Sequence, residues 1–484
     1  MASDAPATVS ISPPSSPQNE ASHTVSAKRL QVPRACERCK RLRRGCSVSR
    51  PCQRCLDAGQ ENQCRPDVET RRAPRIVLDN VPGTARQQLT ELLPAPFLDF
   101  CISRFFARLY PTIPILTSDY ISRVRNVSHY PERGLQPGYI LLGMCAQVLL
   151  QTERPEDLSS LGIIEQSSLD YSHVLLEKAE SIWQLLPRAA PITIELCLFA
   201  FFLYACEAVL SHHSRAFRYL RETTTLLLLY QGEGADEMER LVSGRLFWVL
   251  LISERSHAIR YKRPITLHIT EETPSLDVLD PSLLGFLNLA ELFRPLDTTF
   301  IGLLNQEMTL SHSPAYINDV EVRVNSALGS GFGLYDTQKA NLRVTQLWLR
   351  LVIWKLRLRL GYLVEDSYQH SMTFRYPMDI AKELMLSTRD LPASSFTVHG
   401  VGMIEKLFDI ASALVGVLAR VPVVPTSPGG ALIDLPVSDL SYLRALIQNS
   451  PGGDSTYDNL LENHIQQTIP SLATRPLLSG QFVS

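Results

Sequence analysis

Apolar residues recur at helical spacing through most of the chain, from residue 94 onward. Leu98, Ile102, Phe105 and Leu109 follow one another at intervals of four, three and four residues, which places them on one face of a helix. Few stretches alternate as strands do. The pattern therefore predicts an all-α body over residues 94–420, with further helices over 139–150, 169–186, 196–210, 215–230, 246–260, 341–363 and 401–417.

The most apolar stretch of this body covers residues 196–206 and lies between Glu195 and Glu207. A helix needs about 20 apolar residues to cross a bilayer, and this stretch is much shorter. We therefore predict a buried helix and no membrane partner.

Three other parts of the chain lack this periodicity. Residues 1–33 are rich in Ser, Pro and Ala and are predicted to form a disordered tail, while the polar, Pro-containing segment 67–93 is predicted to be a flexible linker. Its heptad pattern is limited to Leu89, Leu92 and Leu93, so a monomer and a homodimer formed through the body both remain open. Residues 421–484 are predicted to be partly disordered and to hold a partner-binding or activation segment.

The distribution of charge along the chain is more informative than the net charge. The net charge is only -2 and the isoelectric point is near 6.6, which alone argues against a nucleic-acid-binding protein. Between Lys28 and Arg54, however, ten basic residues face a single acid, Glu37. A basic segment on an otherwise acidic chain indicates one end that binds a polyanion.

Six of the ten cysteines lie within the 29 residues from Cys36 to Cys64, which overlap this basic segment. A C-x2-C pair and a third cysteine occur twice in succession, and a C-x2-C pair places two thiolates on one turn, where both reach the same metal ion. The other four, Cys101, Cys145, Cys197 and Cys206, stand in apolar helical contexts and are predicted to be ordinary buried residues. The six clustered residues are Cys36, Cys39, Cys46, Cys52, Cys55 and Cys64.

Six sulfurs in this arrangement fit two zinc ions. Two tetrahedral ions need eight sulfur positions, and six cysteines supply them if one cysteine of each half bridges both metals. The segment has few aliphatic residues to bury, so it cannot fold by itself. Metal binding, on the order of 10–16 kcal/mol per structural site, would supply the missing free energy. The expected cofactor is two Zn²⁺ per chain.

These spacings resemble those of the fungal Zn2Cys6 binuclear-cluster transcription factors. The resemblance implies a DNA-binding module over residues 34–66, with Cys36 and Cys52 as the bridging ligands. Other readings of the cysteines are weaker: RING and LIM domains use histidine or further cysteines, and no histidine lies between His23 and His129. An iron-sulfur site or a redox C-x2-C pair would need a different spacing or context.

Four cations stand between the second and third cysteines, on a predicted short helix over residues 40–45 that Gly45 can cap. In the family this helix enters the major groove and contacts CGG-type triplets. We predict that Arg43 contacts a guanine and that the other basic side chains meet phosphates. Leu42 and Gly45 depart from the family pattern. The phosphate contacts are assigned to Arg38, Lys40, Arg41, Arg44 and Arg54, and the expected partner is double-stranded, GC-rich DNA.

Motifs in the body resemble the middle homology region of the same family. They are 105–116, which resembles its opening segment, and Arg245-Leu-Phe-Trp248 followed by Glu254-Arg255 and Arg263-Pro264. The Glu254-Arg255 variant and the segment Gly402-Met-Ile-Glu-Lys-Leu-Phe-Asp409 look closest to members resembling maltose-type activators and to regulators of metabolite gene clusters. From the residues alone, Arg245, Trp248 and Arg255 are expected to stabilise helix packing.

Nothing in the body indicates catalysis. No phosphate-binding loop is present, and the adjacent pair His212-His213 is read as a solvated helix end. We therefore predict a nuclear, non-enzymatic RNA polymerase II transcription factor that regulates a metabolic gene set, either a secondary-metabolite cluster or a carbon-source pathway, together with co-regulators. The rival hypothesis is an enzyme or scaffold whose cysteine segment is only a metal-stabilised interaction module.

Overall fold

The structure, a computed structural model, describes residues 35–42, 44, 46–47, 51–64, 89–127, 136–152, 158, 162, 164–186, 191–276, 281–306, 314–329, 333–421, 434–450 and 453–470. The chain divides into two compact units, Met1–Pro82 and Gly83–Ser484. The described residues contain helices and no β-strand. The predicted tail, 1–33, and most of the predicted linker lie outside the described residues.

The first unit is built around its cysteines. It contains α1 (Glu37–Arg41), α2 (Gln53–Leu56) and the 3-10 turn η1 (Glu61–Gln63). The buried apolar residues described here are all cysteines, with Ala35 and Cys46 packed against them. This confirms that the segment has almost no aliphatic core of its own.

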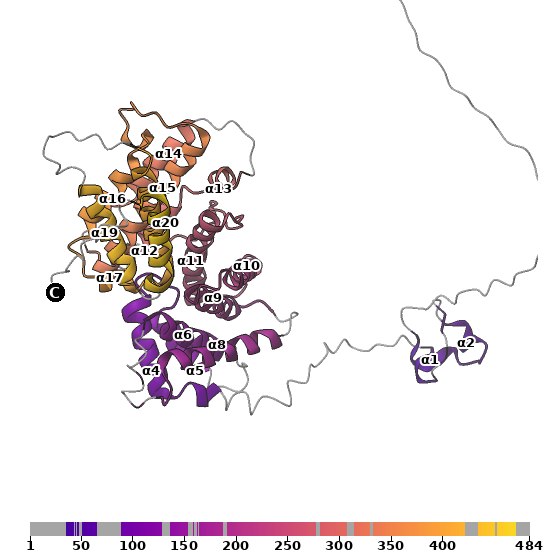
Figure 1. Ribbon diagram of the computed structural model, residues 1–484. Coiled ribbons are helices and arrows are strands. Elements are labelled where there is room, and N and C mark those ends of the chain that lie inside the picture. The colour runs from indigo at the N-terminus through magenta and orange to yellow at the C-terminus, as the bar shows by residue number, and fades with distance from the viewer. Residues whose placement is uncertain are drawn as a thin grey trace, which may run out of the picture. The chain divides into compact units, whose positions relative to one another are not determined.

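The second unit begins with helices that pack around α6 and α9 (Figure 1). The two central helices are largely or wholly buried, whereas the surrounding helices expose a polar face. The elements of this part are α4 (Ala95–Arg104), the π-helical turn η3 (Phe105–Leu109), α5 (Ser118–Val127), α6 (Gln136–Thr152), α8 (Ser168–Leu185), α9 (Ile194–Val209) and α10 (His213–Leu229).

The later helices pack around α15 and α18, and the long helix α11 (Glu237–Tyr261) lies between the two groups (Figure 1). α11 contacts α9 and α10 on one side and α12 and α13 on the other. The remaining elements are η5 (Pro281–Leu283), α12 (Leu284–Phe293), α13 (Thr298–Asn305), α14 (Pro314–Ser326), α15 (Asp336–Leu360), η6 (His370–Met372), α16 (Tyr376–Thr388), α17 (Ser394–Thr397), α18 (Val401–Leu418), α19 (Asp434–Gln448), η7 (Gly453–Asp458) and α20 (Asn459–Thr468).

Local sequence sets where several of these helices begin and end. Ser167, Asp236 and Asp297 cap α8, α11 and α13 by accepting a hydrogen bond from the backbone N–H three residues later. Gly361 ends α15 in the left-handed region, with φ 72°. Each polar cap satisfies a backbone group that the helix itself leaves unpaired.

The motif residues of α11 hold the two groups of helices together, as the packing hypothesis expected. Arg245 donates to Tyr110 Oη at 2.9 Å, Trp248 Nε1 donates to the carbonyl of Pro274 at 2.7 Å, and Arg255 donates to the carbonyl of Phe293 at 2.8 Å. All three side chains of the motif are buried. Each side chain therefore makes at least one hydrogen bond to a group from another part of the chain.

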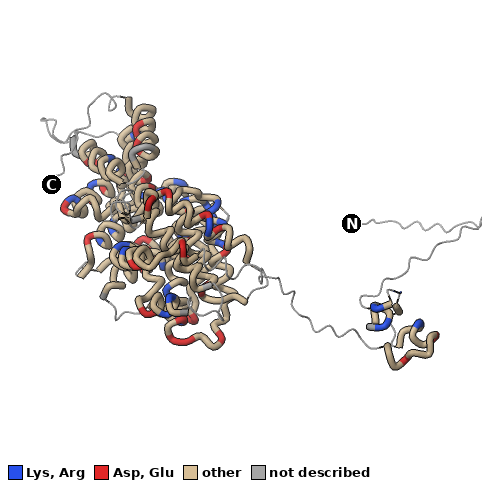
Figure 2. The backbone as a smooth tube through the Cα atoms, turned by 90° about the horizontal axis from the view of Figure 1, so that it is seen from below, with Lys and Arg blue, Asp and Glu red and all other residues tan. Residues whose placement is uncertain are grey.

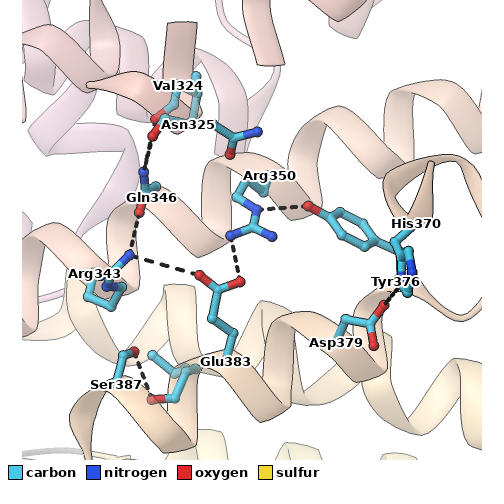
Figure 3. A network of polar contacts seen from close by, with 11 residues as sticks. Val324, Asn325, Arg343, Gln346, Arg350, His370, Tyr376, Asp379, Glu383 and Ser387 are labelled. Atoms are coloured by element: carbon cyan, nitrogen blue, oxygen red, sulfur yellow. Dashed lines mark hydrogen bonds and ion pairs between the residues drawn. The ribbon is translucent and has the colours of Figure 1, made fainter. Parts of the chain in front are cut away.

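A polar network connects α14, α15 and α16 (Figure 3). Arg350 donates to Tyr376 Oη and to Glu383 Oε2, each at 2.7 Å. Gln346 accepts from Arg343 at 2.9 Å and donates to the carbonyl of Val324 at 3.0 Å. Three helices that are separate in the sequence are thus joined by charge-assisted and neutral hydrogen bonds.

The predicted helices are confirmed, with two differences at the ends of the body. Leu89, Leu92 and Leu93, the heptad fragment of the predicted linker, pack against the hydrophobic core. Residues 434–448 and 453–468 of the predicted C-terminal segment form α19, η7 and α20, which pack on α18. The core therefore extends beyond both expected boundaries, because short apolar repeats next to Pro, Gly and Ser still find a partner in the body.

None of the helices described is both long and apolar enough to span a lipid bilayer. The stretch 196–206 lies within α9, whose residues from Ile194 to Glu207 are all buried or nearly so. This confirms the buried helix.

Candidate metal centre and nucleic-acid interface

Each C-x2-C pair begins a short helix. Cys36 directly precedes α1, and Cys52 is the N-cap of α2. The backbone N–H of Cys39 donates to Cys36 Sγ at 3.4 Å. A sulfur at the amino end of a helix thus accepts hydrogen bonds from N–H groups that would otherwise be unpaired.

The third cysteine of each half is tied to the first in the same way. The backbone N–H of Cys36 donates to Cys46 Sγ at 3.4 Å, and that of Cys52 donates to Cys64 Sγ at 3.1 Å. The two halves of the segment therefore repeat one local arrangement.

The sulfurs of both halves meet at the centre of the unit. Cys36 Sγ lies 3.9 Å from Cys52 Sγ and 3.7 Å from Cys55 Sγ, and Cys39 Sγ lies 3.7 Å from Cys52 Sγ. The Sγ atoms of these four residues all lie within 4.8 Å of one another. Cys36 and Cys52 are thus each close to sulfurs of both halves.

These distances fit tetrahedral zinc. With Zn–S bonds of about 2.3 Å, two sulfurs on one ion stand about 3.8 Å apart. The cysteines are not joined in disulfides, and five of the six are buried. Bound zinc would cross-link the two halves through these thiolates and would contribute folding free energy to a unit without an aliphatic core.

The surroundings of Cys36 and Cys52 differ from those of the other clustered cysteines. Burial opposes ionisation of both thiols, but backbone N–H groups and neighbouring thiols outweigh it and lower the pKa of each below its usual range. Burial raises the pKa of Cys39 and Cys46, and it raises that of Cys55 to about 11.

The cations beside the cluster are only partly described. Arg41, Arg44 and Arg54 are exposed, as a surface that meets phosphates requires, and the part of the unit around α1 is rich in Lys and Arg (Figure 2). Lys40 lies in α1, but its side chain is outside the described residues. Arg43 lies outside them altogether.

The helix beside the cluster differs from the prediction. It begins at Glu37 and ends at Arg41 rather than covering residues 40–45. The capping sulfur of Cys36 starts it early, and the bond from the Cys36 N–H to Cys46 requires the chain to turn back. The N–H of Arg44 closes this end by donating to the carbonyl of Cys39 at 3.0 Å.

Arg38 has a contact that the sequence did not suggest. Its Nη1 lies 3.8 Å from Cys55 Sγ, and the side chain is half-buried. The guanidinium can therefore stabilise a thiolate ligand of the other half. Its position between the two cysteines of the first pair was the available signal, because a side chain there stands next to the sulfurs.

The remaining candidates behave as structural groups. Cys101, Cys145, Cys197 and Cys206 are buried, as predicted. His212 is exposed at the start of α10, but both histidines of the pair have partners: His212 Nδ1 lies 2.8 Å from Glu207 Oε2, and His213 Nδ1 lies 2.8 Å from Tyr261 Oη. Among the described residues, the cysteine cluster is the one group arranged to hold a metal.

Comparison with known proteins gives relatives over most of the chain. A probable sucrose utilization protein of Candida albicans is 23% identical over 424 residues, which cover 80% of this chain and 79% of that protein. A maltose fermentation regulatory protein of Saccharomyces cerevisiae is 22% identical over 81% of this chain and 85% of its own length. A respiratory transcription factor of the same yeast is 23% identical over 67% of this chain and 70% of its own length.

No family model matches the chain, and no solved structure matches it. The relatives nevertheless include named regulatory proteins and a transcription factor, and their similarity covers 67–81% of the chain. The chain is thus similar to yeast regulators of maltose and sucrose use, and its cysteine spacing and sulfur cluster fit a module of the fungal Zn2Cys6 type.

Proposed function

We propose that this chain is a nuclear transcription factor that binds two zinc ions and recognises CGG-type promoter elements of genes for carbon-source use. The observation that carries the proposal is the sulfur cluster, in which the two C-x2-C pairs converge beside a short basic helix while the third cysteine of each half accepts a hydrogen bond from the first. The names of the relatives, which concern sucrose, maltose and respiration, favour a carbon-source pathway over a secondary-metabolite cluster.

Two zinc ions are supported by the way the cysteines meet. Cys36 and Cys52 each approach sulfurs of both halves, which is the position that a ligand shared by two ions must occupy. Cys39 and Cys46 would complete the coordination of one ion, and Cys55 and Cys64 would complete that of the other. The metals would be structural, because they fix the backbone of α1 and leave no open coordination position.

The DNA contacts follow from charge and exposure. Arg41, Arg44 and Arg54 are exposed to solvent, so they can contact phosphates of a duplex without losing an internal partner among the described residues. Lys40 and Arg38 would add to this set, and Arg43 would read a guanine. Because Arg38 also reaches Cys55 Sγ, its replacement would affect the cluster as well as DNA affinity.

The experiment compares Arg43→Ala with Lys40→Ala in the full chain, by fluorescence anisotropy on a CGG-containing duplex and on a scrambled duplex of equal length. Arg43→Ala should lose about 1–3 kcal/mol on the CGG duplex and much less on the scrambled one. Lys40→Ala should weaken both alike and reduce the salt dependence. If Arg43→Ala loses the same affinity on both duplexes, the assignment of base recognition to Arg43 is wrong.

A zinc-replete chain without sequence-dependent affinity for any GC-rich duplex would favour the rival hypothesis, a metal-stabilised interaction module. Selection of bound sequences from a random duplex pool by the full chain distinguishes the two. Enrichment of CGG triplets supports the proposal, and an unenriched pool contradicts it.

A further inference from the structure

A cavity of about 240 Å³ lies in the body where helices of both groups meet. It is bordered by α6, α9 and α10, by α11, and by α12, α15 and α18. Phe201, Phe286 and Phe293 form part of its apolar wall. Since a cavity of about 150 Å³ accommodates benzene, this one has room for a molecule of about ten non-hydrogen atoms.

Polar atoms around this cavity lack partners. Within the described part of the chain, Gln147 Oε1, His257 Nδ1 and Arg260 Nη2 are buried and make no hydrogen bond, and all three residues line the cavity. Buried polar atoms are nearly always satisfied. Three such atoms around one space indicate that their partner is a molecule that enters it.

Two cations also line the cavity. The Arg260 guanidinium and the Lys406 ammonium lie 5.4 and 5.6 Å from the centroid of the Trp348 ring. Arg260 is paired with Glu405 at 3.0 Å and with Asp409 at 3.5 Å. Its Nη2 atom remains without a hydrogen bond.

Lys406 has no such counter-ion. Its Nζ donates to Thr345 Oγ1 at 2.8 Å, and no carboxylate among the described residues forms an ion pair with it. An ammonium has three hydrogens to donate, so two remain. Burial, and then the charge of Arg260, lower the pKa of Lys406 to about 7 against the opposing effect of Glu405, as expected for a partly buried ammonium that no carboxylate contacts directly.

We propose that this cavity binds a small organic monoanion whose carboxylate pairs with Lys406 and Arg260 and whose apolar part lies against Phe201, Phe286 and Phe293. A carboxylate would supply the charge that Lys406 lacks and an acceptor for Arg260 Nη2. A neutral polyol of the same size would leave the ammonium uncompensated. This site does not depend on the cysteine cluster, so its test is independent of the proposed DNA binding.

The test uses the full chain and three carboxylates of eight to ten non-hydrogen atoms: hexanoate, benzoate and phenylacetate. Phenylacetamide is the uncharged match to phenylacetate, and acetate lacks the apolar part. Isothermal titration calorimetry should show saturable binding of at least one of the three acids, and both controls should bind at least tenfold more weakly. Absence of binding by all three overturns the proposal.

Two variants assign the binding to this cavity. Lys406→Met keeps the length of the side chain without its charge and should weaken acid binding at least tenfold, whereas Lys355→Met, at an exposed position of α15, should leave it unchanged. Ala208→Leu fills the cavity from α9 without changing either cation and should also abolish binding. Binding that survives both Lys406→Met and Ala208→Leu places the acid elsewhere and overturns the proposal.

Proton uptake gives a second readout. The charged or titratable groups near Lys406 are Arg260 on α11, His399 before α18, and Glu405 beside it. A carboxylate would raise the pKa of Lys406, so binding at pH 8 should take up protons, measured by calorimetry in two buffers of different ionisation enthalpy. Maltose or sucrose binding that is insensitive to Lys406→Met, without acid binding, would identify a neutral-sugar site instead.

Discussion

Glu254 is the residue of the α11 motif whose replacement tests the structure most sharply. Its side chain is 1% exposed and accepts three hydrogen bonds. Arg221 Nη1 donates to Oε1 at 2.7 Å, Thr266 Oγ1 donates to the same oxygen at 2.6 Å, and the backbone N–H of Leu267 donates to Oε2 at 2.9 Å. One carboxylate therefore joins α10, α11 and the segment that follows Arg263-Pro264.

Replacing Glu254 by Gln keeps the shape and removes the charge. The amide presents N–H donors where Oε2 accepted from Leu267, so at most two of the three bonds survive, and these become neutral. Hydrogen bonds to a charged group contribute about 1.5–3 kcal/mol each. Because Arg221 is 31% exposed, water partly solvates it after the change, and the expected loss is roughly 3 kcal/mol.

All four tryptophans, Trp183, Trp248, Trp348 and Trp354, lie in the second unit, so tryptophan fluorescence follows unfolding of the body alone. A loss of roughly 3 kcal/mol should lower its melting temperature by about 3–6 °C in a protein of this size. Glu291→Gln, which removes a 46% exposed partner of Arg294, should change it by less than about 1 °C.

The double variant Glu254→Gln with Arg221→Gln measures the interaction of this pair apart from the other hydrogen bonds of Glu254. Replacing Arg221 should cost less in the Glu254→Gln background than in the native chain, because its main partner is already neutral. Two results would contradict the structural role of this carboxylate. One is a Glu254→Gln variant with the melting temperature of the native protein, and the other is additive effects of the two replacements on stability.

Two further predictions concern buried charges of the body. Arg357 and Glu321 form an ion pair at 2.7 Å with 1% and 4% of their side chains exposed, so Glu321→Gln should lower the free energy of unfolding by about 3–5 kcal/mol in urea titrations. The matched change in the exposed Arg323–Asp319 pair, Asp319→Asn, should lower it by under about 0.5 kcal/mol. Equal losses for the two changes would contradict the burial of the Arg357–Glu321 pair. The lowered pKa of Lys406, about 7 against about 10.4 when unfolded, means that the unfolded chain binds more protons between these values. Stability should therefore rise with pH across that window, and Lys406→Met should lack this increment in parallel urea titrations; identical pH profiles would refute the lowered pKa of Lys406.

The helical body could be predicted where apolar spacing was strong. α9 is apolar over nearly its whole length, and α15 and α18 carry long apolar repeats. α5 and α14 were missed because short helices rich in polar residues obtain their stability from packing rather than from their own sequence. α19 was missed because Pro, Gly and Ser surround an apolar repeat that includes Leu440 and Leu443, both buried.

The candidate metal centre was predictable because its information is local. Cysteine spacing fixes which sulfurs can reach one ion, and all six candidate ligands lie within 29 residues. The start of α1 was not predictable from charge, since the Cys36 sulfur and not the basic run determines where the helix begins.

The cavity of the body could not be predicted from the sequence, because its information is not local. Its walls come from positions as distant as Gln147, Arg260 and Lys406, and nothing in the sequence around each one marks it as facing a common space. Only the packing of α6, α11 and α18 brings them together.

Zinc content measured together with DNA affinity tests the central claim most directly. Native mass spectrometry of the full chain should find two zinc ions per chain, and exhaustive chelation should abolish preference for a CGG duplex while tryptophan fluorescence of the body stays unchanged. Returning zinc should restore both the mass and the preference. A metal-free chain that still distinguishes the CGG duplex from a scrambled one would contradict the account.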